Sequence, residues 1–255
     1  MTPDLKSVLL SLKLHHLAGN LDDFVARATR DRSGPLEVIE AIARHESEER
    51  QRRSVERRLR AAQIGRFRAM ADFDWAWPDA IDRERVERLL ALDFLGEKDN
   101  VVLASAPGLG KTMIARNVAY QAVLAGHSVL FITAAQMLLD LGQQDSPRAL
   151  QARLRRYTSP ALICLDEVGY MSYDARSADL LFEIVNRRYE RGSILLTTNL
   201  AFSDWPKHFP GAACVTAMIE RITHHAEIVA IEGKSYRLKE AGERQTQKSA
   251  KPGRR

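Results

Sequence analysis

Residues 101–112 read VVLASAPGLGKT, a short apolar run that leads directly into a glycine-rich turn. A run of this kind, bounded by glycine and proline, is typical of a buried β-strand. The residues from Lys111 onward return to a helical pattern. The stretch therefore predicts a strand, a tight loop and a helix in immediate succession, which is the opening of an α/β fold.

Four further short apolar runs are also typical of buried strands, at residues 129–132, 161–165, 194–196 and 228–231. Helical patterns separate most of them. Strands that alternate with helices in this way predict a parallel, doubly wound sheet with helices on both faces. We therefore expect an α/β core that begins near residue 100.

The turn after the first strand matches the second half of the phosphate-binding P-loop, Gly-x-x-x-x-Gly-Lys-Ser/Thr, with Ser105 where the first glycine is usual. Glycines let backbone N–H groups turn towards phosphate oxygens. Lys111 would reach the β- and γ-phosphates and Thr112 would ligate Mg²⁺, while the helix adds its positive end. ATP and Mg²⁺ are the expected cofactors. The predicted nucleotide-binding residues are Ser105, Ala106, Pro107, Gly108, Leu109, Gly110, Lys111, Thr112, Met113 and Asp166.

Two later runs end in polar residues that suit catalysis. The run at 161–165 leads into Asp166, which can hold Mg²⁺ through water, and Glu167, which can polarise an attacking water molecule. The run at 194–196 leads through two threonines to Asn199, whose amide can bond that water or the γ-phosphate. The spacing from Lys111 to Asp166 leaves room for further elements, so the two motifs need not lie on adjacent strands.

Together these motifs resemble the pattern of AAA+ ATPases. The runs YDARSADLLFEIVNRRYE at 173–190, IERITHHAEIV at 219–229 and GKSYRLK at 233–239 resemble the IstB proteins, helper ATPases of insertion-sequence transposition. They are also similar to the related helicase loader DnaC. The resemblance extends over residues 4–240.

The resemblance implies a AAA+ core that lacks the usual C-terminal helical lid. It also implies binding to DNA with ATP, assembly into a homo-oligomer on DNA, and delivery of target DNA to a partner transposase. By matching positions, Asn199 would be the sensor residue, Arg221 the arginine finger and Arg237 a second basic contact near the nucleotide. The pair His224-His225 is not expected to bind a metal, because adjacent residues on one element point apart.

A helical segment precedes the core. Leucines at positions 10, 14, 17 and 21 follow the spacing of one helix face, and the Ser-Gly-Pro sequence at 33–35 interrupts the pattern. The run FDWAWP at 73–78 is expected to be a hinge, or else packed core. We expect a helical N-terminal domain at 1–72, a AAA+ core at 73–240 whose residues 73–99 are linker and lead-in helix, and a disordered basic tail at 241–255.

The charge distribution indicates a polyanionic partner. The net charge is +5, but residues 44–68 carry nine arginines against four glutamates, and residues 234–255 carry eight basic residues against two glutamates. Duplex DNA bound mainly through its phosphates is the expected partner, with solvated helix faces as the alternative. The candidate contacts are Arg148, Arg153, Arg155 and Arg156, or Arg52, Arg53, Arg57 and Arg58.

Several alternatives remain open. The expected function is an ATP-dependent DNA-binding ATPase that assembles on target DNA and activates a transposase. A DnaC-like helicase loader, a small-molecule P-loop kinase and a scaffold that binds nucleotide without hydrolysing it are the rivals. The absence of an apolar run of 18 residues argues against a membrane span, and two cysteines in apolar surroundings fit the cytoplasm.

Overall fold

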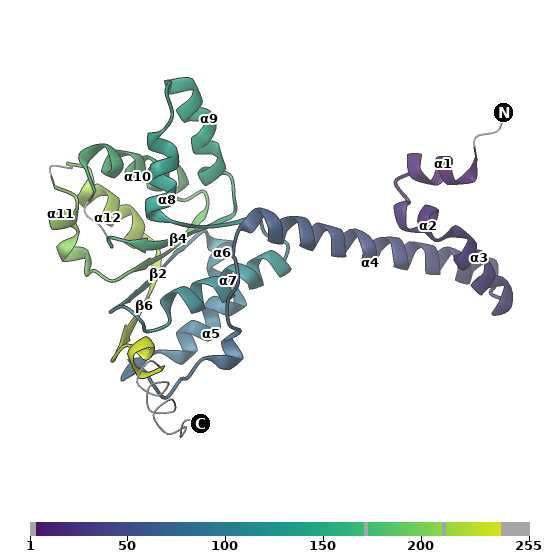
Figure 1. Cartoon of the computed structure of the whole chain (residues 1–255), viewed down its shortest axis with the longest axis horizontal. Helices are drawn as coiled ribbons and strands as arrows, with labels where there is room; N and C mark the ends of the chain where they lie inside the picture. Colours follow the sequence, from purple (N-terminus) through teal and green to yellow (C-terminus); the bar gives the residue numbers. More distant parts are fainter. Residues whose placement is uncertain (1–3, 171–172, 211–212, 241–255) are drawn as a thin grey trace, which may run out of the picture. The chain divides into compact units, whose positions relative to one another are not determined.

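The computed structural model describes residues 4–170, 173–210 and 213–240. The chain divides into two units, Met1–Arg58 and Leu59–Arg255, and each is described by itself. Figure 1 shows the elements of both. The basic tail expected at 241–255 lies outside the described residues.

The larger unit is built on one sheet, which has six strands within the described residues. Its order is β1-β6-β2-β5-β4-β3, with β1 antiparallel to β6 and every other neighbouring pair parallel. All five apolar runs predicted as strands are confirmed as β2 to β6. The two-residue β1 was not predicted, because it is too short to carry a pattern. The strands are β1 Ala80–Ile81, β2 Asn100–Ser105, β3 Val129–Thr133, β4 Leu162–Val168, β5 Ser193–Thr198 and β6 Ala226–Glu232.

Helices cover both faces of this sheet, as Figure 1 shows. Successive strand residues point to opposite faces. Val101 and Leu103 therefore pack with one set of helices, and Val102 packs with the other. The first set is α5 Arg83–Ala91, α6 Asp93–Glu97 and α7 Lys111–Leu124; the second is α8 Ala134–Gly142, α9 Pro147–Thr158, α10 Ala175–Arg188, α11 Trp205–His208 and α12 Val215–His224. The expectation of an α/β core with helices on both faces is confirmed.

Residues 59–72 pack with the larger unit. Ala62 and Ile64 are buried in its core, and Asn117 on α7 holds the following segment. The Asn117 side chain accepts a hydrogen bond from Met70 N at 3.1 Å and donates one to Arg68 O at 2.9 Å. We therefore propose a domain boundary after residue 58 in place of the one expected after residue 72.

The smaller unit contains α1 Leu5–Ser11, α2 His15–Gly19, α3 Leu21–Arg30 and the first part of α4 Pro35–Ala62. The predicted single leucine stripe is wrong in part, because Lys13 has a left-handed φ of 60° and the chain turns there. Leu10 is consequently 49% exposed, and Leu9 is buried in its place beside Leu17. The turn changes the face that each leucine presents.

Helix α4 begins at Pro35, directly after the predicted interruption, and proline is favoured at the first position of a helix. Of the apolar residues in its first turns, Leu36 and Ile39 are exposed, whereas Ile42 packs against the small core. The helix has 28 residues but is rich in arginine and glutamate. No described helix is both long and apolar enough to cross a membrane.

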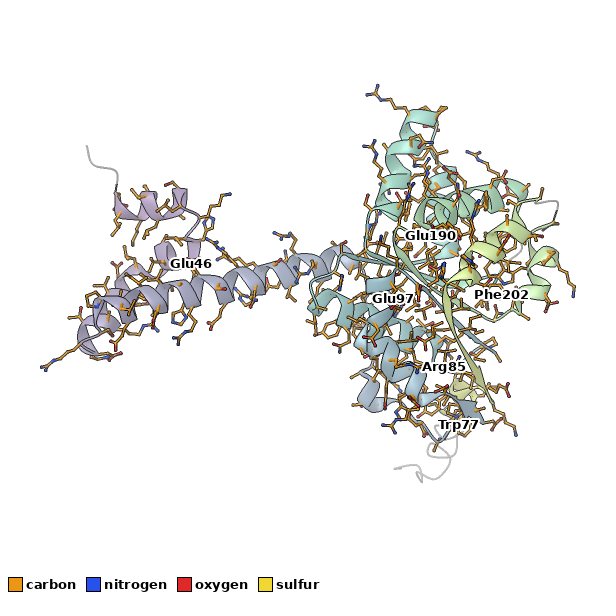
Figure 2. The ribbon with its side chains drawn as sticks, turned by 180° about the vertical axis from the view of Figure 1, so that it is seen from behind. Glu46, Trp77, Arg85, Glu97, Glu190 and Phe202 are labelled. Atoms are coloured by element: carbon orange, nitrogen blue, oxygen red, sulfur yellow. The ribbon has the colours of Figure 1, made fainter. Side chains whose placement is uncertain are left out.

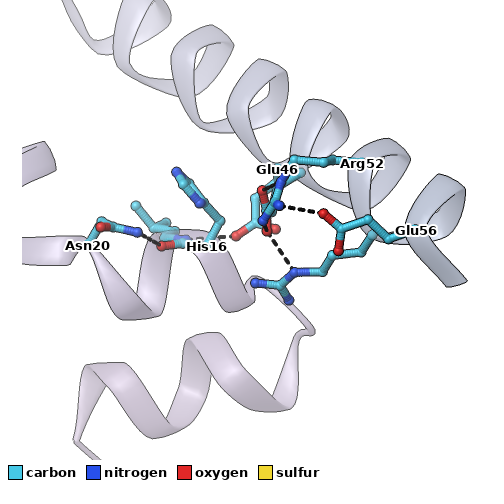
Figure 3. Close-up of polar contacts among 8 residues, drawn as sticks. His16, Asn20, Glu46, Arg52 and Glu56 are labelled. Atoms are coloured by element: carbon cyan, nitrogen blue, oxygen red, sulfur yellow. Dashed lines mark hydrogen bonds and ion pairs between the residues drawn. The ribbon is translucent and has the colours of Figure 1, made fainter. Parts of the chain in front are cut away.

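A buried carboxylate joins α4 to α2, as Figure 3 shows. Glu46 is only 5% exposed, and its Oε1 accepts a hydrogen bond of 2.8 Å from Leu17 N. Leu17 lies in the first turn of α2, where backbone N–H groups have no partner within the helix. Glu46 therefore acts as a cap supplied by another helix.

Replacing Glu46 by alanine is expected to loosen the smaller unit. The buried N–H of Leu17 would lose its acceptor, which costs about 1–3 kcal/mol. Amide hydrogen exchange on the full chain should become faster in residues 15–19 and remain unchanged in β2. Glu48→Ala is the matched control, since Glu48 is exposed and its ion pair within the described residues is with His45. Equal exchange in both variants would contradict a capping role.

Candidate nucleotide-binding site

The loop between β2 and α7 requires glycine at two positions. Gly108 and Gly110 have φ values of 83° and 91°, which L side chains rarely adopt. A Cβ on Gly110 would lie 2.6 Å from a ring carbon of Phe73, and one on Gly108 would overlap Ser235 Oγ. The loop is thus shaped by its own glycines and closely covered by two distant parts of the chain.

Lys111 points back into this loop. Its Nζ donates to Ser105 O at 2.7 Å, to Ser105 Oγ at 2.9 Å and to Ala106 O at 3.0 Å. The pKa of the ammonium is lowered to about 8, chiefly by burial; Asp166 opposes this shift, and Arg237 adds to it. Phosphate oxygens are stronger acceptors than these neutral groups, so the lysine is well placed to exchange them for a polyphosphate.

The two residues expected to hold Mg²⁺ lie together. Thr112 Oγ1 donates to Asp166 Oδ1 at 3.0 Å, and Thr197 Oγ1 donates to the same oxygen at 2.6 Å. Asp166 is 4% exposed. A hydroxyl beside a carboxylate supplies the hard oxygen ligands that Mg²⁺ prefers. The donor set therefore fits a magnesium ion that would neutralise phosphate charge when bound.

Glu167 is directed away from Asp166 by a β-bulge. Leu165 pairs with Leu196 but Val168 pairs with Thr198, so β4 carries one extra residue between them. Glu167 has a left-handed φ of 61°, and its N–H donates to Thr197 Oγ1 at 2.9 Å. The bulge buries one carboxylate and exposes the next one to the cavity.

Asn199 follows β5, which lies between β2 and β4 in the sheet. The expectation that the P-loop strand and the Asp-Glu strand need not be adjacent is confirmed. Asn199 and Glu167 line a cavity of about 310 Å³ together with the P-loop. The predicted residues that line it are Pro107, Gly108, Leu109, Gly110, Lys111, Thr112, Met113, Glu167 and Asn199. Ser105, Ala106 and Asp166 are not among its lining residues and act through the hydrogen bonds described above.

The sequence analysis missed an aromatic wall of this cavity. Trp77 and Tyr236 meet edge to face with ring centroids 5.9 Å apart, and Trp77 Nε1 donates to Lys234 O at 2.8 Å. Phe73 lines the same cavity, whereas Trp75 packs against the core. The FDWAWP run at 73–78 was the available signal, because part of it forms the wall instead of a hinge.

The segment after β6 closes over the P-loop. Tyr236 N donates to Gly108 O at 2.9 Å, and Arg237 lines the cavity. Lys239 Nζ lies 4.3 Å from the centre of the Trp77 ring. The basic residue that the family resemblance associates with the nucleotide is therefore next to the cavity.

Arg221 lies elsewhere. Its guanidinium carbon is 5.0 Å from the centre of the Phe182 ring and 5.9 Å from that of Tyr189, and the residue is half-buried. Its carbonyl accepts a 3.4 Å hydrogen bond from Asn100, the first residue of β2. The P-loop follows the other end of β2, so Arg221 is at the opposite edge of the sheet from the nucleotide cavity.

The arginines considered for DNA contact differ in their surroundings. On α9, Arg153 forms two 2.6 Å hydrogen bonds with Asp140, which also accepts from the Tyr157 hydroxyl. Arg148, Arg155 and Arg156 are exposed. On α4, both Arg52 and Arg53 donate to Glu49 at 2.7 Å, and both Arg57 and Arg58 donate to Ser54.

Comparisons with known proteins identify the family of this chain. The family profile of the IstB-like ATP binding protein matches residues 7–244. A Pseudomonas aeruginosa protein named as the ATP-binding protein of insertion sequence IS21 is 33% identical over 237 residues, which cover 93% of this chain and 89% of the relative. Its counterpart from insertion sequence IS5376 of Geobacillus stearothermophilus is 33% identical over 192 residues, covering 75% of this chain and 76% of the relative.

The fold is similar to that of DnaI. The DnaI crystal structure superposes with a TM-score of 0.54 at 19% identity, covering 66% of this chain and 93% of that one. The larger unit thus has the AAA+ P-loop fold, and ATP is the ligand that its family binds. The chain belongs to the IstB-like ATP binding protein family of insertion sequences.

Proposed function

We propose that this chain hydrolyses ATP, binds duplex DNA through the phosphate backbone, assembles on it as a homo-oligomer and activates a partner transposase. The observation that carries the ATPase part is the convergence of Lys111, Thr112, Glu167 and Asn199 at one cavity edge. The transposase part is supported by relatives named for insertion sequences.

The cavity is lined both by the polar groups of the P-loop and strand ends and by aromatic side chains. In our proposal the phosphates lie on the P-loop near Lys111, and the base lies towards Trp77 and Tyr236. Glu167 then faces the γ-phosphate and accepts a proton from the attacking water, while the Asn199 amide orients that water. A bound Mg²⁺ at Thr112 and Asp166 would neutralise the charge that develops on the phosphates. Water activation favours hydrolysis over transfer to a small acceptor.

Helix α9 is the DNA-binding element in this proposal. It contains four arginines and no acidic residue. The Asp140 carboxylate binds Arg153 and Tyr157, which fixes α9 against α8. Arg148 and Arg155 are exposed, and because they are seven residues apart they lie on the same face of the helix. The arginines of α4 are less suited, because Glu49 neutralises Arg52 and Arg53 locally.

A phosphate-release assay with and without duplex DNA tests the proposal. DNA should stimulate release, and the double variant Arg148→Ala/Arg155→Ala should need more DNA for the same stimulation. Each phosphate contact contributes about 0.9 to the slope of log K against log salt, so the slope should fall by about 2. Arg52→Ala/Arg53→Ala is the matched double variant and should change the slope less.

Each other outcome favours a rival. If the salt-dependence slope changes more in the α4 variant than in the α9 variant, the DNA contact lies on α4. Phosphorylation of a small acceptor would favour a kinase, and absence of release would favour a scaffold. A second experiment distinguishes a transposase helper from a helicase loader. The ATP-bound assembly on DNA is mixed with either the transposase of the same insertion sequence or a replicative helicase, and binding of each to the assembly is measured. Binding of the helicase alone would contradict our proposal.

A further inference from the structure

Three ligating side chains meet at the edge of the sheet opposite the nucleotide cavity. Glu190 follows α10, and His224 and His225 lie at the end of α12. One ligating atom from each of the three side chains lies within 4.8 Å of the others. Figure 2 labels Glu190 far from Trp77, which lines the nucleotide cavity. The cluster is therefore separate from the ATP site.

The two histidines converge because the helix ends between them. His224 is the last residue of α12, whereas His225 has φ −127° and ψ 82°, outside the helical region. Their ring centroids are 4.1 Å apart. The expectation that adjacent residues point apart holds within one helix, and it is wrong here because the backbone leaves the helix at His225.

The backbone around the cluster is held in place by buried side chains. The carbonyl of His225 accepts a 2.7 Å hydrogen bond from Asn100 N, and Asn100 Oδ1 accepts one of 3.0 Å from Ile194 N on β5. On the Glu190 side, the buried guanidinium of Arg188 donates to Ser193 O at 2.7 Å. The loops before β5 and β6 are thus fixed to the same sheet edge, which positions the three side chains in advance.

Tyr189 provides the outer contact that metal-binding histidines commonly have. Its hydroxyl lies 2.8 Å from His224 Nδ1. In the tautomer whose Nδ1–H donates to the hydroxyl oxygen, Nε2 of His224 is left to bind an ion. On the other side, His225 Nε2 is 3.9 Å from Glu190 Oε1. Tetrahedral ligands of zinc are about 3.4 Å apart for bonds near 2.0–2.1 Å, so small side-chain rotations close the site.

We propose that Glu190, His224 and His225 form a binding site for a divalent transition-metal ion of the zinc type. Two imidazoles and a carboxylate suit such ions, whereas Mg²⁺ prefers oxygen ligands throughout. Three protein ligands leave the remaining coordination to water, since all three side chains are exposed. The guanidinium of Arg221 is nearby, but it is stacked over Phe182 and Tyr189. The ion would join the end of α10 to the end of α12.

Zinc titration of the tag-free full chain, without nucleotide, tests the site. Wild type should bind one Zn²⁺ per chain, and zinc should raise its melting temperature. His224→Asn and His225→Asn should each lower the affinity at least tenfold, and Tyr189→Phe should lower it about tenfold as an outer partner. With Co²⁺ as the probe, the wild-type chain should develop the visible absorption of a low-symmetry cobalt site, and His225→Asn should not.

His127→Asn is the matched control, because His127 precedes β3 and is not part of the cluster. It should bind zinc as the wild type does. The proposal is overturned if wild type shows no saturable binding of one ion, or if His225→Asn keeps the wild-type affinity. Because the three ligands are exposed, their substitution should not affect folding. Equal melting temperatures of the variants and the wild type in the presence of a chelator would verify this.

Discussion

The Glu167→Gln variant is expected to bind ATP as the wild type does and to hydrolyse it more slowly by a factor of about 10²–10⁴. An amide cannot accept the proton that the attacking water must lose. The bulge in β4 would be unaffected, because Glu167 takes part in it through its backbone N–H, which donates to Thr197 Oγ1. The variant should therefore accumulate as an ATP-bound assembly on DNA.

Binding of a fluorescent ATP analogue and single-turnover phosphate release would measure the two steps separately. Glu87→Gln is the matched control, since Glu87 is exposed on α5 and pairs with Arg83. Lys111→Ala supplies the opposite control and should lose ATP binding, because the phosphates would lose the lysine of the loop. Wild-type turnover in Glu167→Gln would mean that another group, with Asn199 the first candidate, activates the water.

The sequence predicted strands β2 to β5 well because most of their residues are buried, on both faces of the sheet. Runs such as VVLA at 101–104 are apolar throughout, so they stand out without any knowledge of their neighbours. The same reasoning failed for the leucines of the smaller unit. The left-handed φ of Lys13 breaks the helix there, and the spacing of leucines alone gives no sign of such a turn.

The candidate site was predictable where its residues are close in sequence. The P-loop and the Asp-Glu pair have their chemistry within a few residues of a strand end. Trp77 and Tyr236 join the cavity only because β1 pairs with β6, which brings the segments before and after the core together. Likewise, Glu190 meets His225 through the order of β5, β2 and β6 in the sheet. Contacts of this kind depend on the order of the strands in the sheet, which a local sequence pattern does not reveal.

We propose that Arg221 acts on a neighbouring subunit, because it lies far from the nucleotide cavity of its own chain. Asn100 contacts the Arg221 carbonyl at the first residue of β2, and the P-loop begins at the last, Ser105. Five residue steps of a strand span about 17 Å, so Arg221 cannot reach the γ-phosphate of its own chain. Arg188 is not an alternative, because it is buried and donates to five backbone carbonyls. Arg187 is held by Glu183 and Gln151.

Arg221→Ala is therefore expected to bind ATP nearly normally and to lose almost all DNA-stimulated hydrolysis. A finger that stabilises charge on the γ-phosphate contributes a factor of about 10³–10⁵ in well-studied GTPases. Because Arg221 also stacks on Phe182 and Tyr189, Arg221→Lys serves as a second variant that keeps the charge and removes the planar fork. Both variants should retain the wild-type melting temperature and be inactive.

Mixing Arg221→Ala with Glu167→Gln distinguishes a shared site from a site within one chain. Each variant alone has every interface defective. In a mixed assembly, a subunit with an intact Glu167 lies beside a neighbour with an intact Arg221, and that interface should hydrolyse ATP. Recovery of activity on mixing, with a maximum near equal amounts, is the expected result. If the mixture stays inactive while both variants assemble together on DNA, the finger is not Arg221. If Arg221→Ala alone hydrolyses ATP at the wild-type rate, the γ-phosphate charge is stabilised within the chain, and Arg237 at the same cavity is then the group to replace.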